Sequence, residues 1–347
     1  MIDHKETTRT RALLGLDIGG TKIEAIAVGQ SLELLSRVTL TTDTSSPLST
    51  VDSIADAIDR VLAQAGIETG DVLSAGVGVP GQVTEGVVRL AVNLKMVDYP
   101  LQDALSSKFP FLTVLENDVR AATLGAYQYI QARNPVSNLA YLSIGTGISA
   151  GLILNGELYR GSNGMAGEIG HIQAEPDGPR CNCGAIGCLE AVAAGPAIAN
   201  QALEAVQSGE GTLLGSFEVL SAERVFEAAQ RDDLVAQKII QRSSKYLARA
   251  IHWLVMAYDV DRIVLGGGVT HAGDPFLNPI LSELALLREQ SELAAAMLPA
   301  DKIVLLPKDY NAGAWGAIAL AQRALRIAPS WGQQPEPGIQ FNNGPVV

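Results

Sequence analysis

The chain has 347 residues, of which 47% are apolar and 18% charged, and its formal net charge is −12. These proportions are ordinary for a soluble globular protein with a substantial core, and they exclude a disordered chain. The acidic balance argues against nucleic acid as a partner, because binding to a phosphate backbone needs a basic surface.

The N-terminal segment and the cysteines indicate a cytoplasmic protein. The segment MIDHKETTRTR is polar and lacks the apolar core of a signal peptide. No apolar stretch reaches the length of a membrane span without an interruption by glycine or charge, so we expect no membrane partner. All three cysteines lie within eight residues, which fits a reducing compartment and a bound metal better than a disulfide framework.

Hydrophobic periodicity and turn residues predict an α/β chain. Two segments have the pattern of a β-hairpin with a small-residue tip, LLGLDIGGTKIEAIAVG from Leu13 and LAYLSIGTGISAGLILNG from Leu139. The further predicted strands are, in chain order, Leu73–Val79, Phe111–Glu116, Arg262–Leu265 and Lys302–Leu306. The predicted helices are Val51–Ala65, Val119–Ala132, Ala222–Ala229, Leu234–Tyr258 and Gly313–Leu325.

The two hairpins resemble each other at an offset of 126 residues, with Asp17 aligned to Ser143 and Gly19 to Gly145. Short hairpins can match by chance; the alternative is two related halves whose hairpin tips face a shared cleft. In that arrangement DIGGTK, Asp17–Lys22, offers N–H groups and a hydroxyl to phosphate oxygens, and Asp17 could hold Mg²⁺ through water. An ordinary tight turn is the alternative for DIGGTK alone.

Two glycine clusters and an Asn-Asp pair follow predicted strands. Gly76–Gly81 matches G-x-G-x-x-G, but Pro80 favours a turn into another strand over the helix that a dinucleotide fingerprint requires. Such a turn could also lie against a small ligand. Asn117-Asp118 could be a helix N-cap, or could place a carboxylate at a strand end to accept a proton from a substrate hydroxyl. Gly266–Gly268 would let a flat ring such as adenine lie on the backbone.

The cysteine cluster has the spacing of a metal site, H-x9-C-x-C-x4-C. Its ligands would be His171, Cys181, Cys183 and Cys188. Three thiolates and one imidazole complete a tetrahedral zinc shell without a position for water, so we expect a structural zinc. The nearby carboxylates Glu168 and Glu190 are either incidental surface groups or acceptors for sugar hydroxyls beside the second ring nitrogen of His171.

Five segments taken together resemble the ROK family of sugar kinases and related repressors. They are DIGGTK (Asp17–Lys22), END (Glu116–Asp118), the stretch SIGTGISAGLILNGELYRG, GEIGH (Gly167–His171) and CNCGAIGCLE (Cys181–Glu190). The resemblance covers residues 13–325 and is greatest to the bacterial glucokinases. It implies a two-lobed α/β fold of the actin-like (ribonuclease H-like) ATPase type, with a zinc-binding loop in the second lobe. The lobes would be residues 1–125 with 312–330, and residues 126–311, followed by a loose tail over 331–347.

The resemblance also implies site roles. Asp118 would be the catalytic base that takes the proton from a sugar hydroxyl as it attacks the γ-phosphate of ATP. The residues implied to bind the sugar are Gly81, Asn93, Asn117, Asp118, Glu168, His171 and Glu190. Those implied to lie near ATP and Mg²⁺ are Asp17, Gly19, Gly20, Thr21, Lys22, Gly145, Thr146, Gly147, Gly267 and Gly268. The implied zinc ligands are the His171 and cysteine set given above.

The implied reaction is ATP-dependent phosphorylation of a hexose, glucose to glucose 6-phosphate in the first instance, by a homodimer or homotetramer. The resemblance departs at Asn93-Leu94-Lys95-Met96, where many of these glucokinases carry a Trp in an NL-x-W pattern. N-acetylmannosamine, N-acetylglucosamine, fructose and allose therefore stay open as substrates. A sugar-responsive regulator is the remaining alternative, but such regulators carry a helix-turn-helix segment ahead of the DIGGTK strand, which only about eleven residues precede here.

Overall fold

Two five-stranded mixed sheets with the same topology form the centre of the computed structural model, which describes residues 10–327. Each sheet begins with three consecutive antiparallel strands and continues with two parallel ones. The first sheet has the order β3 (Leu34–Thr41), β2 (Lys22–Gly29), β1 (Ala12–Ile18), β4 (Val72–Val79) and β8 (Leu112–Asn117). The second has the order β11 (Glu157–Tyr159), β10 (Ile148–Leu154), β9 (Leu139–Ile144), β12 (Arg262–Gly266) and β13 (Ile303–Leu305). The equivalence favours two related halves over a chance match of hairpins.

A third, three-stranded sheet and ten α-helices complete the described part of the chain. The small sheet has the order β5 (Gln82–Thr84), β6 (Val87–Ala91) and β7 (Met96–Tyr99). The helices are α1 (Pro47–Ala65), α2 (Leu101–Ser106), α3 (Asp118–Gln131), α4 (Leu189–Ala193), α5 (Gly195–Gln207), α6 (Ala222–Gln230), α7 (Leu234–Tyr258), α8 (Asp274–Gln290), α9 (Glu292–Met297) and α10 (Ala312–Ile327). Short 3₁₀ turns are η1 (Thr69–Asp71), η2 (Val92–Leu94), η3 (Ile169–His171), η4 (Leu213–Ser216), η5 (Gly268–Ala272) and η6 (Ala300–Lys302).

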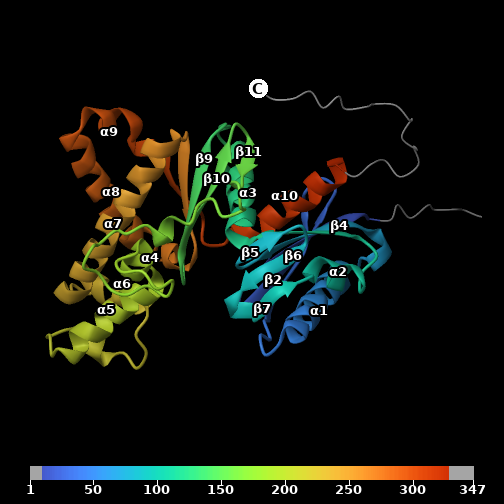
Figure 1. Cartoon of the computed structure of the whole chain (residues 1–347), viewed down its shortest axis with the longest axis horizontal. Helices are drawn as coiled ribbons and strands as arrows, with labels where there is room; N and C mark the ends of the chain where they lie inside the picture. The colour runs from blue at the N-terminus through green and yellow to red at the C-terminus, as the bar shows by residue number, and fades with distance from the viewer. Residues whose placement is uncertain (1–9, 328–347) are drawn as a thin grey trace, which may run out of the picture.

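Helices α3 and α10 lie between the two sheets (Figure 1). Their backbones cross in close contact, since a Cβ on Gly125 would lie 2.1 Å from the Ala312 carbonyl oxygen and one on Gly316 1.6 Å from that of Ala121. Separate apolar cores fill the two sides, one between the first sheet and α1, the other between the second sheet and α7. The predicted division into lobes at 125/126 and 311/312 stays a prediction; its first boundary falls within α3, and its tail over 331–347 lies outside the described residues.

Helix α10 also packs directly on the first sheet, because two strand glycines leave room for it. A Cβ on Gly15 would lie 2.3 Å from the Ala314 carbonyl oxygen, and one on Gly76 1.9 Å from that of Ala317. The first glycine of the G-x-G-x-x-G match therefore accommodates a helix. Strand β4 then turns through Pro80-Gly81 into β5, which confirms the strand-to-strand turn over a dinucleotide fingerprint.

Capping residues fix where two of the predicted helices begin. Helix α1 begins four residues before the predicted Val51, because the Ser46 side chain accepts a hydrogen bond from the Ser49 N–H and Pro47 occupies the first turn. The predicted Val119–Ala132 helix begins one residue earlier, with Asn117 as its N-cap. Strands β5 and β6 cover the segment QVTEGVVRL, where a further strand was expected after Pro80-Gly81. Strands β3, β7 and β11 and helices α2, α4, α5, α8 and α9 were not predicted. Within residues 10–327, none of the helices combines the length and apolar composition that crossing a membrane requires.

Candidate active site

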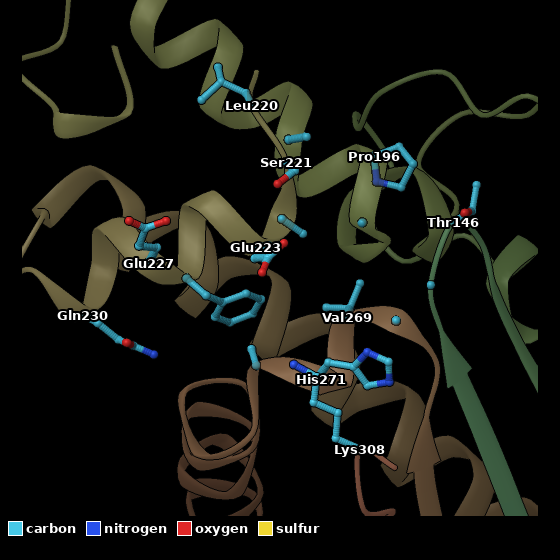
Figure 2. A pocket seen from close by; sticks show the side chains of 17 residues that line it. Thr146, Pro196, Leu220, Ser221, Glu223, Glu227, Gln230, Val269, His271 and Lys308 are labelled. Carbon is cyan, nitrogen blue, oxygen red and sulfur yellow. The ribbon is translucent and has the colours of Figure 1, made fainter. Parts of the chain in front are cut away.

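Two adjoining cavities lie where the hairpin tips, α3, η5 and the start of α10 meet. The larger, of about 830 Å³, is lined by Gly145 and Thr146 of the second hairpin tip and by residues of α5, α6 and η5 (Figure 2). The smaller, of about 380 Å³, contains Asp17 and Asp118. Gly268, His271 and Lys308 line both cavities. A ligand that occupied both would have one end beside two carboxylates and the other in the larger pocket.

Asp17 and Asp118 are brought together in the smaller cavity although 100 residues separate them. Asp17 is the penultimate residue of strand β1, and Asp118 is the first residue of α3. The Asn311 side chain donates a hydrogen bond to Asp17, while its Oδ1 accepts one from the Ala314 N–H at 3.0 Å and so caps α10. Gly313 stands against the same carboxylate, where a Cβ would lie 2.4 Å from Asp17 Cγ.

Burial shifts the titration of both carboxylates. It raises the pKa of Asp17 from 3.8 to about 6, with the charge of Asp118 as the second cause. The pKa of Asp118 is also raised by burial, against the opposing hydrogen bond from the Val119 N–H and the charge of Arg120. Raised carboxylate pKa values in a cavity are typical of groups that exchange protons or hold a cation.

Asn117 is a helix N-cap, which was one of the two alternatives considered for the Asn-Asp pair. Its Oδ1 accepts a hydrogen bond from the Arg120 N–H at 3.1 Å, which makes it the N-cap of α3. Its Nδ2 donates to the Gly81 carbonyl at 3.0 Å and to Asp118 Oδ1 at 2.9 Å. The cap therefore also joins the turn after β4 to the Asp118 carboxylate and orients that carboxylate.

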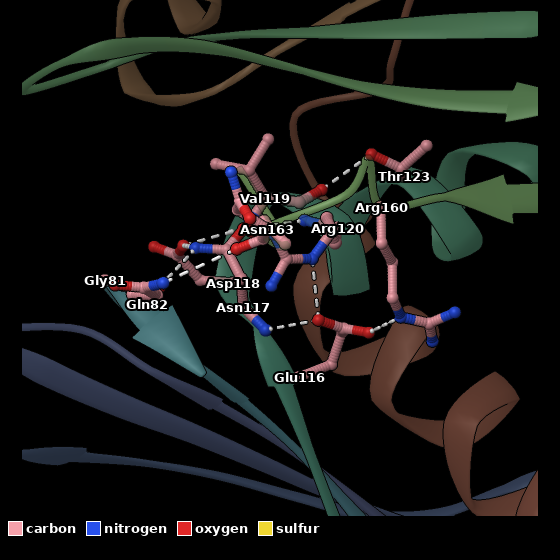
Figure 3. A network of polar contacts seen from close by, with 11 residues as sticks. Gly81, Gln82, Glu116, Asn117, Asp118, Val119, Arg120, Thr123, Arg160 and Asn163 are labelled. Atoms are coloured by element: carbon pink, nitrogen blue, oxygen red, sulfur yellow. Dashed lines mark hydrogen bonds and ion pairs between the residues drawn. The ribbon is translucent and has the colours of Figure 1, made fainter. Parts of the chain in front are cut away.

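A polar network centred on the buried side chains of Glu116 and Arg120 adjoins the Asn117-Asp118 pair (Figure 3). Glu116 receives the Arg120 guanidinium at 2.7 Å on one oxygen and the Arg160 guanidinium at 2.8 Å on the other. Arg120 also donates to the Gly164 carbonyl, and the Gln82 side chain donates to the Asn163 carbonyl at 3.4 Å. These contacts hold the segment 160–164, which leads to Glu168 and His171, against the Asn117-Asp118 end of α3.

The four predicted zinc ligands converge. The ligand atoms of His171, Cys181, Cys183 and Cys188 all lie within 4.8 Å of one another. Cys181 Sγ is 3.7 Å from His171 Nδ1, and Cys183 Sγ is 3.7 Å from Cys188 Sγ, far longer than a disulfide bond. Zinc–sulfur bonds of about 2.3 Å give tetrahedron edges of about 3.8 Å, so this donor set fits zinc in both chemistry and spacing. Nδ1 faces the cysteines, which leaves Nε2 directed elsewhere.

The two carboxylates beside the cluster differ in their surroundings. Glu190 is the second residue of the short helix α4, and its Oε2 accepts a hydrogen bond from the Ile148 N–H at 3.0 Å. It therefore links the zinc loop to the second hairpin. Glu168 is exposed and follows Gly167, whose φ of 98° and approach to the Ala150 carbonyl admit only glycine. That contact sets the direction in which the chain enters η3 and His171.

The predicted nucleotide residues separate into three groups. Gly145, Thr146 and Gly268 line the larger cavity, and Asp17, Lys22, Gly267 and Gly268 line the smaller one. Gly19, Gly20, Thr21 and Gly147 line neither. Gly20 lies against Asn93 of η2, with 3.2 Å between its Cβ position and the Asn93 Cβ, so this predicted sugar residue is beside the first hairpin tip.

Sequence patterns missed Asn311, Lys308 and Arg120. Asn311 precedes the predicted Gly313–Leu325 helix by two residues, so a helix-capping signal was present for it. Lys308 and Arg120 had no local signal, because Lys308 reaches the site from the loop after β13 and Arg120 is a charged residue on a helix.

The chain belongs to the ROK family, whose family model matches residues 13–324. It is 36% identical over 278 residues to a glucokinase from Halalkalibacterium halodurans, covering 78% of this chain and 84% of that protein. It is 34% identical over 258 residues to an N-acetylmannosamine kinase from Yersinia pseudotuberculosis, covering 74% and 82%. A ROK family glucokinase from Streptomyces griseus, solved with glucose and AMPPNP, superposes with a TM-score of 0.77 at 28% identity and covers 90% of this chain and 99% of that one. The predicted ROK-type α/β fold is thereby confirmed.

Proposed function

We propose that this protein is an ATP-dependent hexose kinase and that glucose is its first candidate substrate. The observation that carries the proposal is the pair of adjoining cavities, one with Asp17 and Asp118 and the other beside the Gly145-Thr146 hairpin tip. The relatives described as glucokinases and the structure solved with glucose and AMPPNP support the same activity. Phosphoryl transfer requires two ligands to be positioned end to end, and adjoining cavities meet that requirement.

In this reaction Asp118 is the general base. Its carboxylate takes the proton of the sugar hydroxyl as that oxygen attacks the γ-phosphorus, the bond to the β–γ bridging oxygen breaks and ADP leaves. The base is worth about 10²–10⁴-fold in rate. Asn117 orients the carboxylate through its hydrogen bond at 2.9 Å. Asp17 would hold Mg²⁺ through water, and the ion, when bound with ATP, would supply positive charge to the phosphates.

The sugar's other hydroxyls are held by Asn117, Glu168, His171 and Glu190, with Asn93 and Gly81 at the edges of the sugar pocket. None of these six residues lines the two cavities, so the sugar pocket extends beyond them from Asp118. Zinc, when bound by His171 and the three cysteines, would fix the fold of one pocket wall and would supply no Lewis acid to the reaction, since its shell has no open position. His171 Nε2 is then available to a sugar hydroxyl, because Nδ1 faces Cys181. A cytoplasmic location and a homodimeric or homotetrameric assembly stay predictions.

N-acetylmannosamine is the second candidate substrate, because an N-acetylmannosamine kinase is among the relatives of comparable identity. The segment Asn93-Leu94-Lys95-Met96, which lacks the Trp of many glucokinases, is the part of the sugar pocket that we expect to decide between glucose and N-acetylmannosamine. In it Leu94 and Met96 are buried, and Lys95 adopts a left-handed φ of 53°. N-acetylglucosamine, fructose and allose complete the set to be tested. A ROK-type regulator is the less favoured alternative.

A coupled ADP-release assay over these sugars with MgATP tests the proposal. Release with at least one sugar is expected, and release with none would contradict it. The Asp118→Asn variant should lose turnover while it still binds the sugar, because the amide keeps the size of the carboxylate but cannot take a proton. Turnover close to that of the wild type would remove Asp118 from the role of base.

A further inference from the structure

One lysine occupies the boundary between the two cavities. Lys308 follows β13 and, with Gly268 and His271, is one of three residues that line both of them. Figure 2 shows its side chain next to the His271 imidazole on one wall of the larger cavity. The positive charges of Lys308 and Lys22 both lower the pKa of His271, after burial, so the three side chains lie within electrostatic reach of one another.

The charges that line the smaller cavity indicate a role for Lys308 in binding an anion. The carboxylates that line it are Asp17, Glu24, Asp118 and Asp309, and the fixed cations are Lys22, Arg37 and Lys308. Arg37 is already paired with Glu24, at 3.5 Å. Within residues 10–327 neither Lys22 nor Lys308 forms an ion pair, but the charge of Lys22 already acts on Asp17. Lys308 is the lysine that lines both cavities, and its exposed side chain can move toward a ligand. A polyanion entering between these carboxylates would be repelled unless a free cation met it there.

Resting on the kinase function proposed above, we propose that Lys308 binds the phosphates of the donor at the boundary and stabilises their charge during transfer. A flexible ammonium on a four-carbon stem suits this role, because it acts as a point charge that follows the phosphate as bonds change. Adenosine in the larger cavity would place its phosphates toward Gly268, His271 and Lys308. Lys308 is then a group that touches the donor, not one that maintains the fold.

Competition by inorganic triphosphate against MgATP tests this role, since the probe carries the phosphates without the nucleoside. Lys308→Met should weaken its inhibition about tenfold or more and lower kcat/KM for MgATP to a similar degree or further, as expected when one charge-stabilising group is removed. Inhibition by adenosine and the KM for sugar should stay within twofold. Lys308→Arg should restore most of the lost affinity. Lys245→Met, which changes an exposed lysine of α7 that lines neither cavity, is the matched control.

Equal triphosphate affinity in Lys308→Met and the wild type would overturn the role. So would a parallel loss of adenosine affinity, because it would indicate damage to the cavity wall. If the wild type phosphorylates none of the sugars, the kinase proposal fails by itself. Calorimetric binding of triphosphate to the wild type and to Lys308→Met then still decides whether this lysine binds phosphate.

Discussion

Arg120 and Glu116 form an ion pair of 2.7 Å across the junction of β8 and α3, with each side chain only 6% exposed. Removing Arg120 leaves the buried Glu116 carboxylate with the half-exposed Arg160 as its remaining charged partner. We expect Arg120→Met to lower the free energy of unfolding by about 3–5 kcal/mol. Urea-induced unfolding followed by circular dichroism measures the change.

Arg89→Met is the control for this prediction, because the Arg89–Asp98 pair is exposed, at 42% and 68% for the two side chains. Its loss should be below about 1 kcal/mol. If both variants lost similar amounts of stability, the network that adjoins Asn117 would be no stronger than a surface ion pair. Since Arg120 also holds the Gly164 carbonyl, we further expect a higher KM for sugar in Arg120→Met.

Asp17→Asn should stabilise the ligand-free protein at neutral pH while it abolishes the binding of Mg²⁺. The pKa of Asp17 is about 6 in the folded protein against an ordinary 3.8, so the folded state binds more protons than the unfolded state between these values. The contribution of Asp17 to stability is therefore greatest below pH 4 and is lost as the pH rises through 6. Asparagine at position 17 does not ionise, so its contribution to the free energy of unfolding does not fall as the pH rises.

We expect Asp17→Asn to gain about 1–3 kcal/mol over the wild type at pH 7.5, discounted for the part of Asp17 that stays open to the cavity, and little at pH 4. Unfolding curves of both proteins at the two pH values provide the difference. A gain that did not depend on pH would contradict the raised pKa. For Asp118, whose pKa is also raised by burial, kcat should fall as the pH drops through that pKa, since the base must be ionised.

The parts of the site that the sequence could predict depend on neighbours along the chain. The Cys181–Cys188 cluster and Asn117-Asp118 carry their spacing or strand-end position in the local sequence. The missed parts depend on distant contacts, as when Lys308 reaches the boundary of the cavities. Helix α8 could not be predicted from the sequence pattern, because Pro279 lies inside it and prolines normally end helices. Pro279 lacks only its own N–H, so one helical bond, to the carbonyl of Pro275, is missing, and α8 continues to Gln290.

Gly313→Ala should impair catalysis more than stability. An added Cβ would come within 2.4–2.7 Å of the Asp17 carboxyl atoms, so that side chain must move, whereas the helix itself favours alanine. We expect a rise of about tenfold in the Mg²⁺ concentration needed for half-maximal activity, with the melting temperature changed by only a few degrees. Gly70→Ala, a glycine with open space around its Cβ position, is the control. Unchanged Mg²⁺ dependence in Gly313→Ala would show that Asp17 tolerates displacement.

Removal of zinc should weaken sugar binding without changing the chemistry. The zinc ligands His171, Cys181, Cys183 and Cys188 join the two ends of one loop. Two residues after Cys188, Glu190 accepts a hydrogen bond from the Ile148 N–H at 3.0 Å. Without the metal, neither the His171 imidazole nor the chain from Cys188 to Glu190 would be held in position. We expect one zinc per chain by elemental analysis of the wild type, and a loss of several degrees in melting temperature after chelation.

In the chelated protein the KM for sugar should rise at least about tenfold while kcat at saturating sugar and the KM for MgATP stay within about threefold, because Asp118 lies on α3 and the larger cavity is lined mostly by residues of α5, α6 and η5. Cys183→Ser should reproduce this pattern, and added zinc should restore the chelated wild type but not the variant. If the chelated protein kept its sugar affinity, the cluster would only stabilise the fold. A fall in kcat alone would instead indicate that the metal acts on the reacting groups, which a shell of four protein ligands does not allow.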